Sequence, residues 1–147
     1  MAAQPILINV ILDKSGSMGP KQADVIGGFN RFVTEQRQAP GRARMIITQF
    51  NTEVTPPTPA VPVEEVLPLT PDTYTPGGNT ALFDAIAQTV GRADAEKRPD
   101  ERVLCLIITD GEENSSRETT LAHITKIIGE HEARGDWTFA YLGAAPR

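Results

Sequence analysis

The sequence predicts an α/β fold with a mainly parallel sheet, and three observations support this. Short apolar runs of strand length alternate along the chain with amphipathic stretches of helix length. The apolar runs are nearly continuous, as in strands that are buried on both faces of a parallel sheet. Two of these runs are closed by an aspartate, at Asp13 and at Asp110.

The first half of the chain predicts two buried strands, one helix and an irregular edge. Residues 5–13 and 43–50 are the apolar runs that predict strands. Residues 21–38 predict an amphipathic helix, because four apolar side chains fall at helical spacing: Val25, Phe29, Phe32 and Val33. Residues 55–62 hold four prolines, which cannot donate to a central ladder, so they predict an edge hairpin or a loop. Residues 63–67 predict a short edge strand.

The second half predicts two helices, two strands and a glycine-containing loop at 70–79. The helix at 80–98 has an inner face formed by Leu82, Ile86, Val90 and Ala93. Residues 103–109 are the clearest buried strand of the chain. The last helix has the apolar stripe Leu121, Ile124, Ile127 and Ile128, and Ser115 with Glu118 predicts a capping box at its start. Gly135 ends this helix, and 137–142 predicts the last strand.

The composition of the chain limits the kinds of protein it can be and the kinds of partner it can bind. The 147 residues suit one domain, 1–147, with a core of its own. The formal charge is −5 and the chain has no lysine or arginine run that could displace phosphate counterions, which argues against a nucleic-acid partner. The apolar run 6–12 is too short to cross a bilayer and follows no basic segment. The single cysteine, Cys105, lies in an apolar run and is expected to be buried. We therefore expect a cytoplasmic, reduced protein without a membrane segment.

Five side chains with oxygen atoms predict a site for a divalent cation. Asp13, Ser15 and Ser17 occupy alternate positions, and Gly16 allows a tight turn between the two hydroxyls. Thr80 follows a Gly-Gly-Asn segment, and Asp110 closes the strand at 103–109. Ligands of parallel sheets bind outside the carboxyl ends of the strands, so both aspartates meet at one edge if their strands are neighbours. We expect Asp13 to lie past the strand end, outside the core.

This order of residues resembles the metal-ion-dependent adhesion site of von Willebrand factor A domains. Three flanking segments are also similar to that family, from about Ile6 to Leu142 and in its short bacterial type: ILDKSGSMG, GGNTALFDAI and LIITDGEEN. The resemblance implies a Rossmann-like three-layer α/β/α sandwich, with a doubly wound, mostly parallel sheet and one antiparallel edge strand.

The resemblance also implies roles for the five residues. Ser15 and Ser17 correspond to direct metal ligands, and Thr80 to a ligand that binds directly or through water. Asp13 and Asp110 correspond to the acids that hold coordinated waters. In the family, an Asp or Glu of a partner protein fills the open coordination position, so the chain is expected to be a metal-dependent protein-binding module.

Mg²⁺ is the expected cation, because hydroxyls and water-bridged acids suit a small octahedral ion, with Mn²⁺ and Ca²⁺ as alternatives. Lys14 and Met18 are expected to point away from the cation and to line the rim that selects partners. The sequence leaves the partner and the oligomeric state open.

Four other interpretations stay open. Ser15 and Ser17 can simply cap the first helix, while Asp110 caps a turn. The chain can be a structural subunit with a vestigial site, or an accessory subunit of an ATPase-driven remodelling complex that uses the same site. In the fourth interpretation the chain is a metal-assisted hydrolase, but the segment around Ser17 lacks the first glycine of a nucleophile elbow. His123 and His131, the two histidines, both fall in the last predicted helix, so we expect no enzymatic activity.

Overall fold

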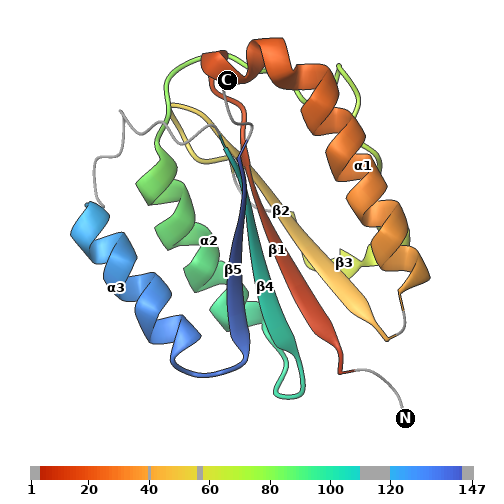
Figure 1. Ribbon diagram of the computed structural model, residues 1–147, viewed down its shortest axis with the longest axis vertical. Helices are drawn as coiled ribbons and strands as arrows, with labels where there is room; N and C mark the ends of the chain where they lie inside the picture. Colours follow the sequence, from red (N-terminus) through yellow and green to blue (C-terminus); the bar gives the residue numbers. More distant parts are fainter. Residues whose placement is uncertain (1–3, 40, 56–57, 110–119, 144–147) are drawn as a thin grey trace.

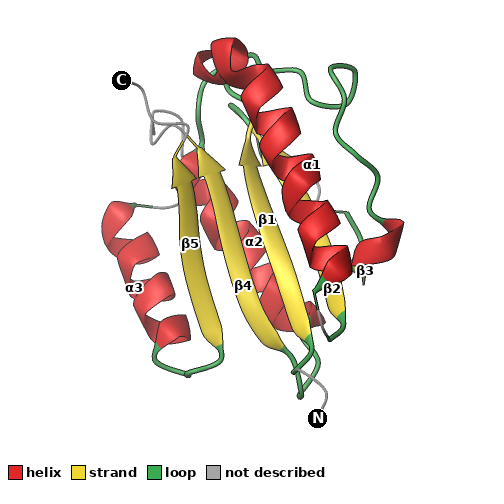
Figure 2. Ribbon diagram, turned by 45° about the vertical axis from the view of Figure 1, so that its right-hand side comes forward, coloured by secondary structure: helices red, strands yellow, loops and turns green. Residues whose placement is uncertain are grey.

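A computed structural model describes residues 4–39, 41–55, 58–109 and 120–143 of the chain. Its five strands form one sheet in the order β3-β2-β1-β4-β5. The strands are β1 (Ile6–Asp13), β2 (Ala43–Phe50), β3 (Val61–Pro62), β4 (Arg102–Thr109) and β5 (Trp137–Gly143). All neighbouring pairs are parallel except β2 with β3, which is antiparallel. Figure 2 shows β1, β4 and β5 with their arrowheads at the same edge of the sheet.

Three helices cover the two faces of this sheet: α1 (Gln22–Gln38), α2 (Leu82–Glu96) and α3 (Leu121–Glu132). Helix α1 lies on one face, and α2 and α3 lie on the other (Figure 1). Two short 3-10 helices, η1 (Gly16–Lys21) and η2 (Val63–Glu65), complete the described elements. The arrangement confirms the predicted three-layer α/β/α sandwich with one antiparallel edge strand.

The core has two layers because β1 is buried on both faces. Leu7 and Ile11 pack toward α2 and α3, whereas Ile8 and Val10 pack toward α1. This explains why the sequence of the central strand shows no alternation of polar and apolar residues. Cys105 of β4 is also fully buried, as predicted, and burial raises the pKa of its thiol to about 12. The thiol is therefore protonated and unreactive at neutral pH.

The edge of the sheet beside β2 differs from the prediction. The antiparallel edge strand is Val61–Pro62, and the predicted strand at 63–67 is wrong, because η2 starts at Val63. Val63 and Val66 are both buried, and their spacing of three places them on one side of a 3-10 turn beneath α1. Arg37 of α1 donates from Nε to the carbonyl oxygen of Val63 and from Nη2 to that of Val66, which fixes this turn.

Helix α3 starts later than its predicted cap. Its N-cap is Thr120, whose hydroxyl accepts a hydrogen bond from the His123 N–H at 3.2 Å. The predicted capping box, Ser115 and Glu118, lies outside the described residues. Leu121 does not belong to the buried stripe, since it is 63% exposed in the first turn of the helix, whereas Ile124 is buried as predicted. After α3, Gly135 adopts a φ of 87°, which favours glycine.

Among the residues that the structure describes, no helix has both the length and the apolar character needed to cross a membrane.

Candidate metal centre

The predicted ligands gather at the carboxyl ends of β1 and β4. These two strands pair directly, with Leu12 opposite Ile108, so their ends lie side by side. The neighbour relationship on which the site prediction depended is therefore confirmed. Asp13 is the last residue of β1, and Thr109 is the last residue of β4. Asp110, the predicted second carboxylate, lies outside the described residues.

The Asp13 carboxylate is held in one orientation by two hydrogen bonds. Its Oδ1 accepts from the Ser15 N–H at 2.7 Å, and its Oδ2 accepts from the Thr109 hydroxyl at 2.8 Å. Asp13 is fully buried and belongs to the strand, so its expected position outside the core is wrong. Each carboxylate oxygen has a further lone pair with which it can accept a hydrogen bond from a coordinated water.

The two serines bring their hydroxyls together. Ser15 Oγ and Ser17 Oγ lie 3.2 Å apart, with Ser15 buried and Ser17 exposed. Ser15 precedes η1 but makes no capping hydrogen bond with its side chain, and the residue that precedes α1 is Lys21. Ser17 lies inside η1. The alternative in which these serines cap the first helix is therefore wrong.

A second loop is joined to the first by main-chain hydrogen bonds. The Gly77 N–H donates to the Lys14 carbonyl oxygen at 2.8 Å, and the Gly16 N–H donates to the Gly78 carbonyl oxygen at 2.9 Å. Gly78 has a φ of 82°, and a Cβ atom there would lie 3.1 Å from the Thr52 hydroxyl oxygen. Glycine is thus required for the close approach of the loops. The segment that leads into the buried Thr80 is held against the serine loop.

Residues after β2 hold this second loop from its other side. Asn51 Nδ2 donates to the Gly77 carbonyl oxygen at 2.9 Å, and the Asn51 carbonyl oxygen accepts from the Ala81 N–H at 2.7 Å. The Thr52 hydroxyl accepts from the Asn79 N–H at 2.9 Å. Asn51 is not among the site residues predicted from the sequence. Its position directly after the carboxyl end of the parallel strand β2 is a signal that could have identified it.

The prediction for one of the two rim residues, Met18, is wrong. Met18 is fully buried in the layer beneath α1, because the 3-10 turn of η1 directs its side chain inward, so its predicted rim position is wrong. Lys14 is half-buried, and its N–H donates to the Phe50 carbonyl oxygen at 2.8 Å, which extends the contact between β1 and β2.

The donors at this end of the sheet suit a hard cation. Within the described ranges, no group of three or more His, Cys, Asp or Glu side chains is placed to hold a metal ion. A cation bound here would instead depend on the Asp13 carboxylate and on the hydroxyls of Ser15, Ser17 and Thr80. Protein oxygen atoms and water are the ligands that Mg²⁺ prefers, so the chemistry of these residues fits such an ion.

Comparison with known protein families assigns the chain to one family. A family model of the von Willebrand factor type A domain matches residues 8–135. The chain belongs to this family. Von Willebrand factor A domains are generally protein-interaction or adhesion modules, and they commonly bind a divalent cation. No curated protein sequence matches the chain.

Solved structures show the same fold at low sequence identity. A von Willebrand factor type A protein from Catenulispora acidiphila is 20% identical with a TM-score of 0.63, and the match covers 96% of this chain and 33% of that one. The ArnB paralog VWA2 from Sulfolobus acidocaldarius is 18% identical with a TM-score of 0.63, covering 97% and 42%. Proximal thread matrix protein 1 from the mussel byssus is 16% identical with a TM-score of 0.63, covering 97% and 38%. This domain therefore spans less than half of each of these chains.

Proposed function

We propose that this von Willebrand factor A domain is a protein-binding module that depends on one divalent cation. Asp13, Ser15, Ser17, Thr80 and Asp110 would hold the cation, and an Asp or Glu side chain of a partner protein would fill its open position. The observation that carries the proposal is the arrangement at the end of β1. Two serine hydroxyl oxygens lie 3.2 Å apart beside a buried carboxylate that the Ser15 N–H and the Thr109 hydroxyl keep in one orientation.

The charge of this donor set favours an anionic partner group. The three hydroxyl ligands are neutral, so Asp13 and Asp110 supply the negative charge of the site. If they act through water rather than by direct contact, the ion keeps much of its attraction for a further carboxylate. Mg²⁺ is the proposed ion because hydroxyl and water ligands suit its octahedral geometry, and Mn²⁺ and Ca²⁺ are the alternatives.

Binding without turnover is the proposed activity, because no described histidine is placed as a general base near the serines. His123 and His131 both lie on α3. The His131 ring packs against the Trp137 ring with centroids 4.5 Å apart, and its Nδ1 lies 2.7 Å from the Ile127 carbonyl oxygen. This histidine has a structural role in the contact between α3 and β5.

The first test is calorimetric titration of chelator-treated protein with Mg²⁺ and with Mn²⁺. We expect saturable one-to-one binding that Ser17→Ala abolishes. Thr125→Ala is the matched control, since it also removes an exposed hydroxyl, but from α3, where Thr125 donates to the Leu121 carbonyl oxygen. Metal affinity that is equal in the Ser17→Ala and unmodified proteins would contradict the assignment of Ser17 as a ligand.

The second test concerns the partner group. Peptide arrays in which each Asp or Glu is replaced in turn by Asn or Gln would be probed with Mg²⁺ and with chelator. We expect bound peptides to lose binding when a single acidic residue is replaced or when the metal is removed. Peptide binding that is insensitive to chelator would contradict a metal-dependent mechanism.

A further inference from the structure

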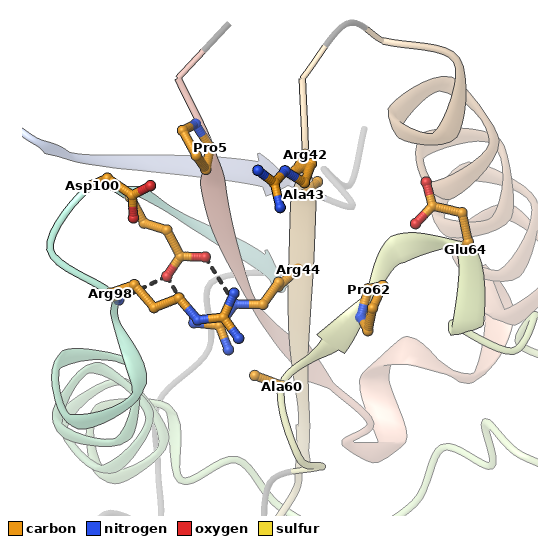
Figure 3. A pocket seen from close by; sticks show the side chains of 10 residues that line it. Pro5, Arg42, Ala43, Arg44, Ala60, Pro62, Glu64, Arg98 and Asp100 are labelled. Atoms are coloured by element: carbon orange, nitrogen blue, oxygen red, sulfur yellow. Dashed lines mark hydrogen bonds and ion pairs between the residues drawn. The ribbon is translucent and has the colours of Figure 1, made fainter. Parts of the chain in front are cut away.

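A second polar site lies at the opposite end of the sheet from the candidate metal centre. A cavity of about 290 Å³ opens beside the amino ends of β1 and β2 (Figure 3). Two prolines and two alanines form its apolar walls. Its charged lining consists of Arg42, Arg44, Glu64, Arg98, Asp100 and Glu101. The serine loop follows the other end of β1, so the two sites are separated by the length of that strand.

An ion pair between Arg44 and Glu101 lines part of the cavity. Arg44 Nε donates to Glu101 Oε2 at 2.8 Å, and its Nη2 donates to Oε1 at 2.7 Å and to the Glu96 carbonyl oxygen at 2.9 Å. Glu101 is only 2% exposed, and Oε1 also accepts from the Arg98 N–H at 2.8 Å. Both oxygens of this carboxylate are thus occupied, and its charge is already compensated from within the protein.

The guanidinium N–H donors of the other two arginines in the lining, Arg42 and Arg98, have no acceptor among the described residues. In the part of the chain that the structure describes, neither the Arg42 nor the Arg98 guanidinium makes a hydrogen bond or a close ion pair. Figure 3 shows Arg42 directed from the start of β2 into the cavity, and the Arg98 side chain directed toward Arg44. Arg98 is close enough to Glu101 for its charge to act on that carboxylate. Each guanidinium carries five N–H donors and no acceptor, and it stays charged at any ordinary pH.

In the described part of the chain, the remaining acidic side chains of the lining accept no hydrogen bond from these guanidiniums. Glu64 and Asp100 are exposed, as are Arg42 and Arg98, so all four charged groups are open to solvent and to a ligand. The cavity therefore combines two uncommitted guanidiniums with short apolar walls. Planar guanidinium forks match the geometry of carboxylate and phosphate groups, which they bind through paired hydrogen bonds.

We propose that this cavity binds a small molecule through an oxyanion, a carboxylate or a phosphate, held by Arg42 and Arg98. The volume is near the lower end of the range for small-molecule sites, so the ligand has the size of a small metabolite. The anion lies between the two guanidiniums, and the short apolar part of the ligand contacts the prolines and alanines. Because Arg44 is already paired with Glu101, it shapes the site and is not assigned to the anion.

The test uses inorganic phosphate and succinate as probes of the two oxyanion types. Each is titrated into the whole chain at constant ionic strength, and binding is followed by calorimetry and by NMR shifts of the arginine Nε–H groups. We expect saturable binding of at least one probe, and a loss of affinity of about tenfold or more in Arg42→Gln and in Arg98→Gln. The stronger probe identifies the oxyanion type. Arg31→Gln is the matched control, because Arg31 is an exposed arginine of α1 outside the cavity.

A titration with Mg²⁺ on the same variants separates this proposal from the proposed metal site. We expect unchanged Mg²⁺ affinity in Arg42→Gln and Arg98→Gln, because they lie at the other end of β1. Saturable binding of neither probe would overturn the inference. Binding that the double variant Arg42→Gln/Arg98→Gln retains, or that Arg31→Gln weakens equally, would overturn it too, since the anion would then bind elsewhere on the surface.

Discussion

The hydroxyl oxygen of Tyr74 lies 2.5 Å from the main-chain carbonyl oxygen of Asp13 and donates a hydrogen bond to it. Tyr74 is fully buried, and its own carbonyl oxygen accepts from Gln22 Nε2 at 2.7 Å. The long loop before α2 is therefore tied both to the start of α1 and to the residue that orients the serine loop. Groups that orient metal ligands in this way contribute to metal affinity without touching the ion.

Tyr74→Phe tests this connection. The substitution keeps the buried ring but leaves the Asp13 carbonyl oxygen without its donor, so we expect Mg²⁺ affinity to fall about tenfold. The free energy of unfolding should fall by about 1 kcal/mol. Calorimetry and urea unfolding measure the two effects. Thr89→Val is the control, since it removes a buried hydroxyl that donates to the Ala85 carbonyl oxygen on α2. If both variants lost Mg²⁺ affinity equally, Tyr74 would affect metal binding only through the stability of the fold.

Asp13→Ala is expected to affect both metal binding and the fold. The substitution removes a proposed ligand and leaves the Ser15 N–H and the Thr109 hydroxyl without their acceptor. We expect Mg²⁺ binding to be lost and the free energy of unfolding of the metal-free protein to fall by about 1–3 kcal/mol. Urea unfolding in chelator measures the second effect. Asp72→Ala, at an exposed loop carboxylate, should change neither quantity. A variant at Asp13 that still bound Mg²⁺ normally would disprove the site.

Gly78→Ala tests the contact between the two loops. Alanine at a φ of 82° is strained, and its Cβ would lie 3.1 Å from the Thr52 hydroxyl oxygen. We expect a loss of about 1–2 kcal/mol in the free energy of unfolding, together with weaker Mg²⁺ binding because Thr80 is displaced. Gly19→Ala is the matched control, since no atom lies within 4 Å of its added Cβ. If both variants behaved alike, the conformation of Gly78 would not be required for the site.

The sequence predicted the parts of the fold whose signal is local, and it placed the serine loop after the carboxyl end of a parallel strand. The central strands are continuous apolar runs. Asp13 ends one of them, Ser15 and Ser17 follow it, and Thr80 precedes α2, so the order of residues carries the information. The prediction for Met18 was wrong because Met18 lies in a 3-10 turn. The side chains of such a turn do not alternate between two sides, as was expected for the loop that carries Ser15 and Ser17. Tyr74 could not be recognised, since its hydroxyl reaches a main-chain oxygen 61 positions away in the chain. A contact of this kind produces no periodicity and no characteristic spacing of residues in the sequence.

The ion pair between Arg44 and Glu101 also joins residues that are far apart in the chain, and it contributes to the stability of the fold in the acid range. Burial by itself raises the pKa of Glu101, but the hydrogen bonds from Arg44 and the Arg98 N–H, with the charges of both arginines, lower it further than burial raises it. A carboxyl whose pKa is lower in the folded state stabilises the fold above its unfolded pKa, about 4.3 for glutamate. This stabilisation is lost as the pH falls through the lower, folded value.

Arg44→Met is expected to leave the buried Glu101 carboxylate without its partner and to cost about 3–5 kcal/mol at pH 7. Burial would then dominate, so the pKa of Glu101 should rise, and part of the lost stability should return as the pH falls toward 4 and the carboxyl is protonated. Urea unfolding between pH 4 and pH 7 measures both effects. The double variant Arg44→Met/Glu101→Leu replaces the pair by apolar side chains and should recover most of the loss at pH 7. A single variant that was as stable as the unmodified protein at pH 7 would contradict this account, because a carboxylate that is 2% exposed cannot be left unpaired without cost.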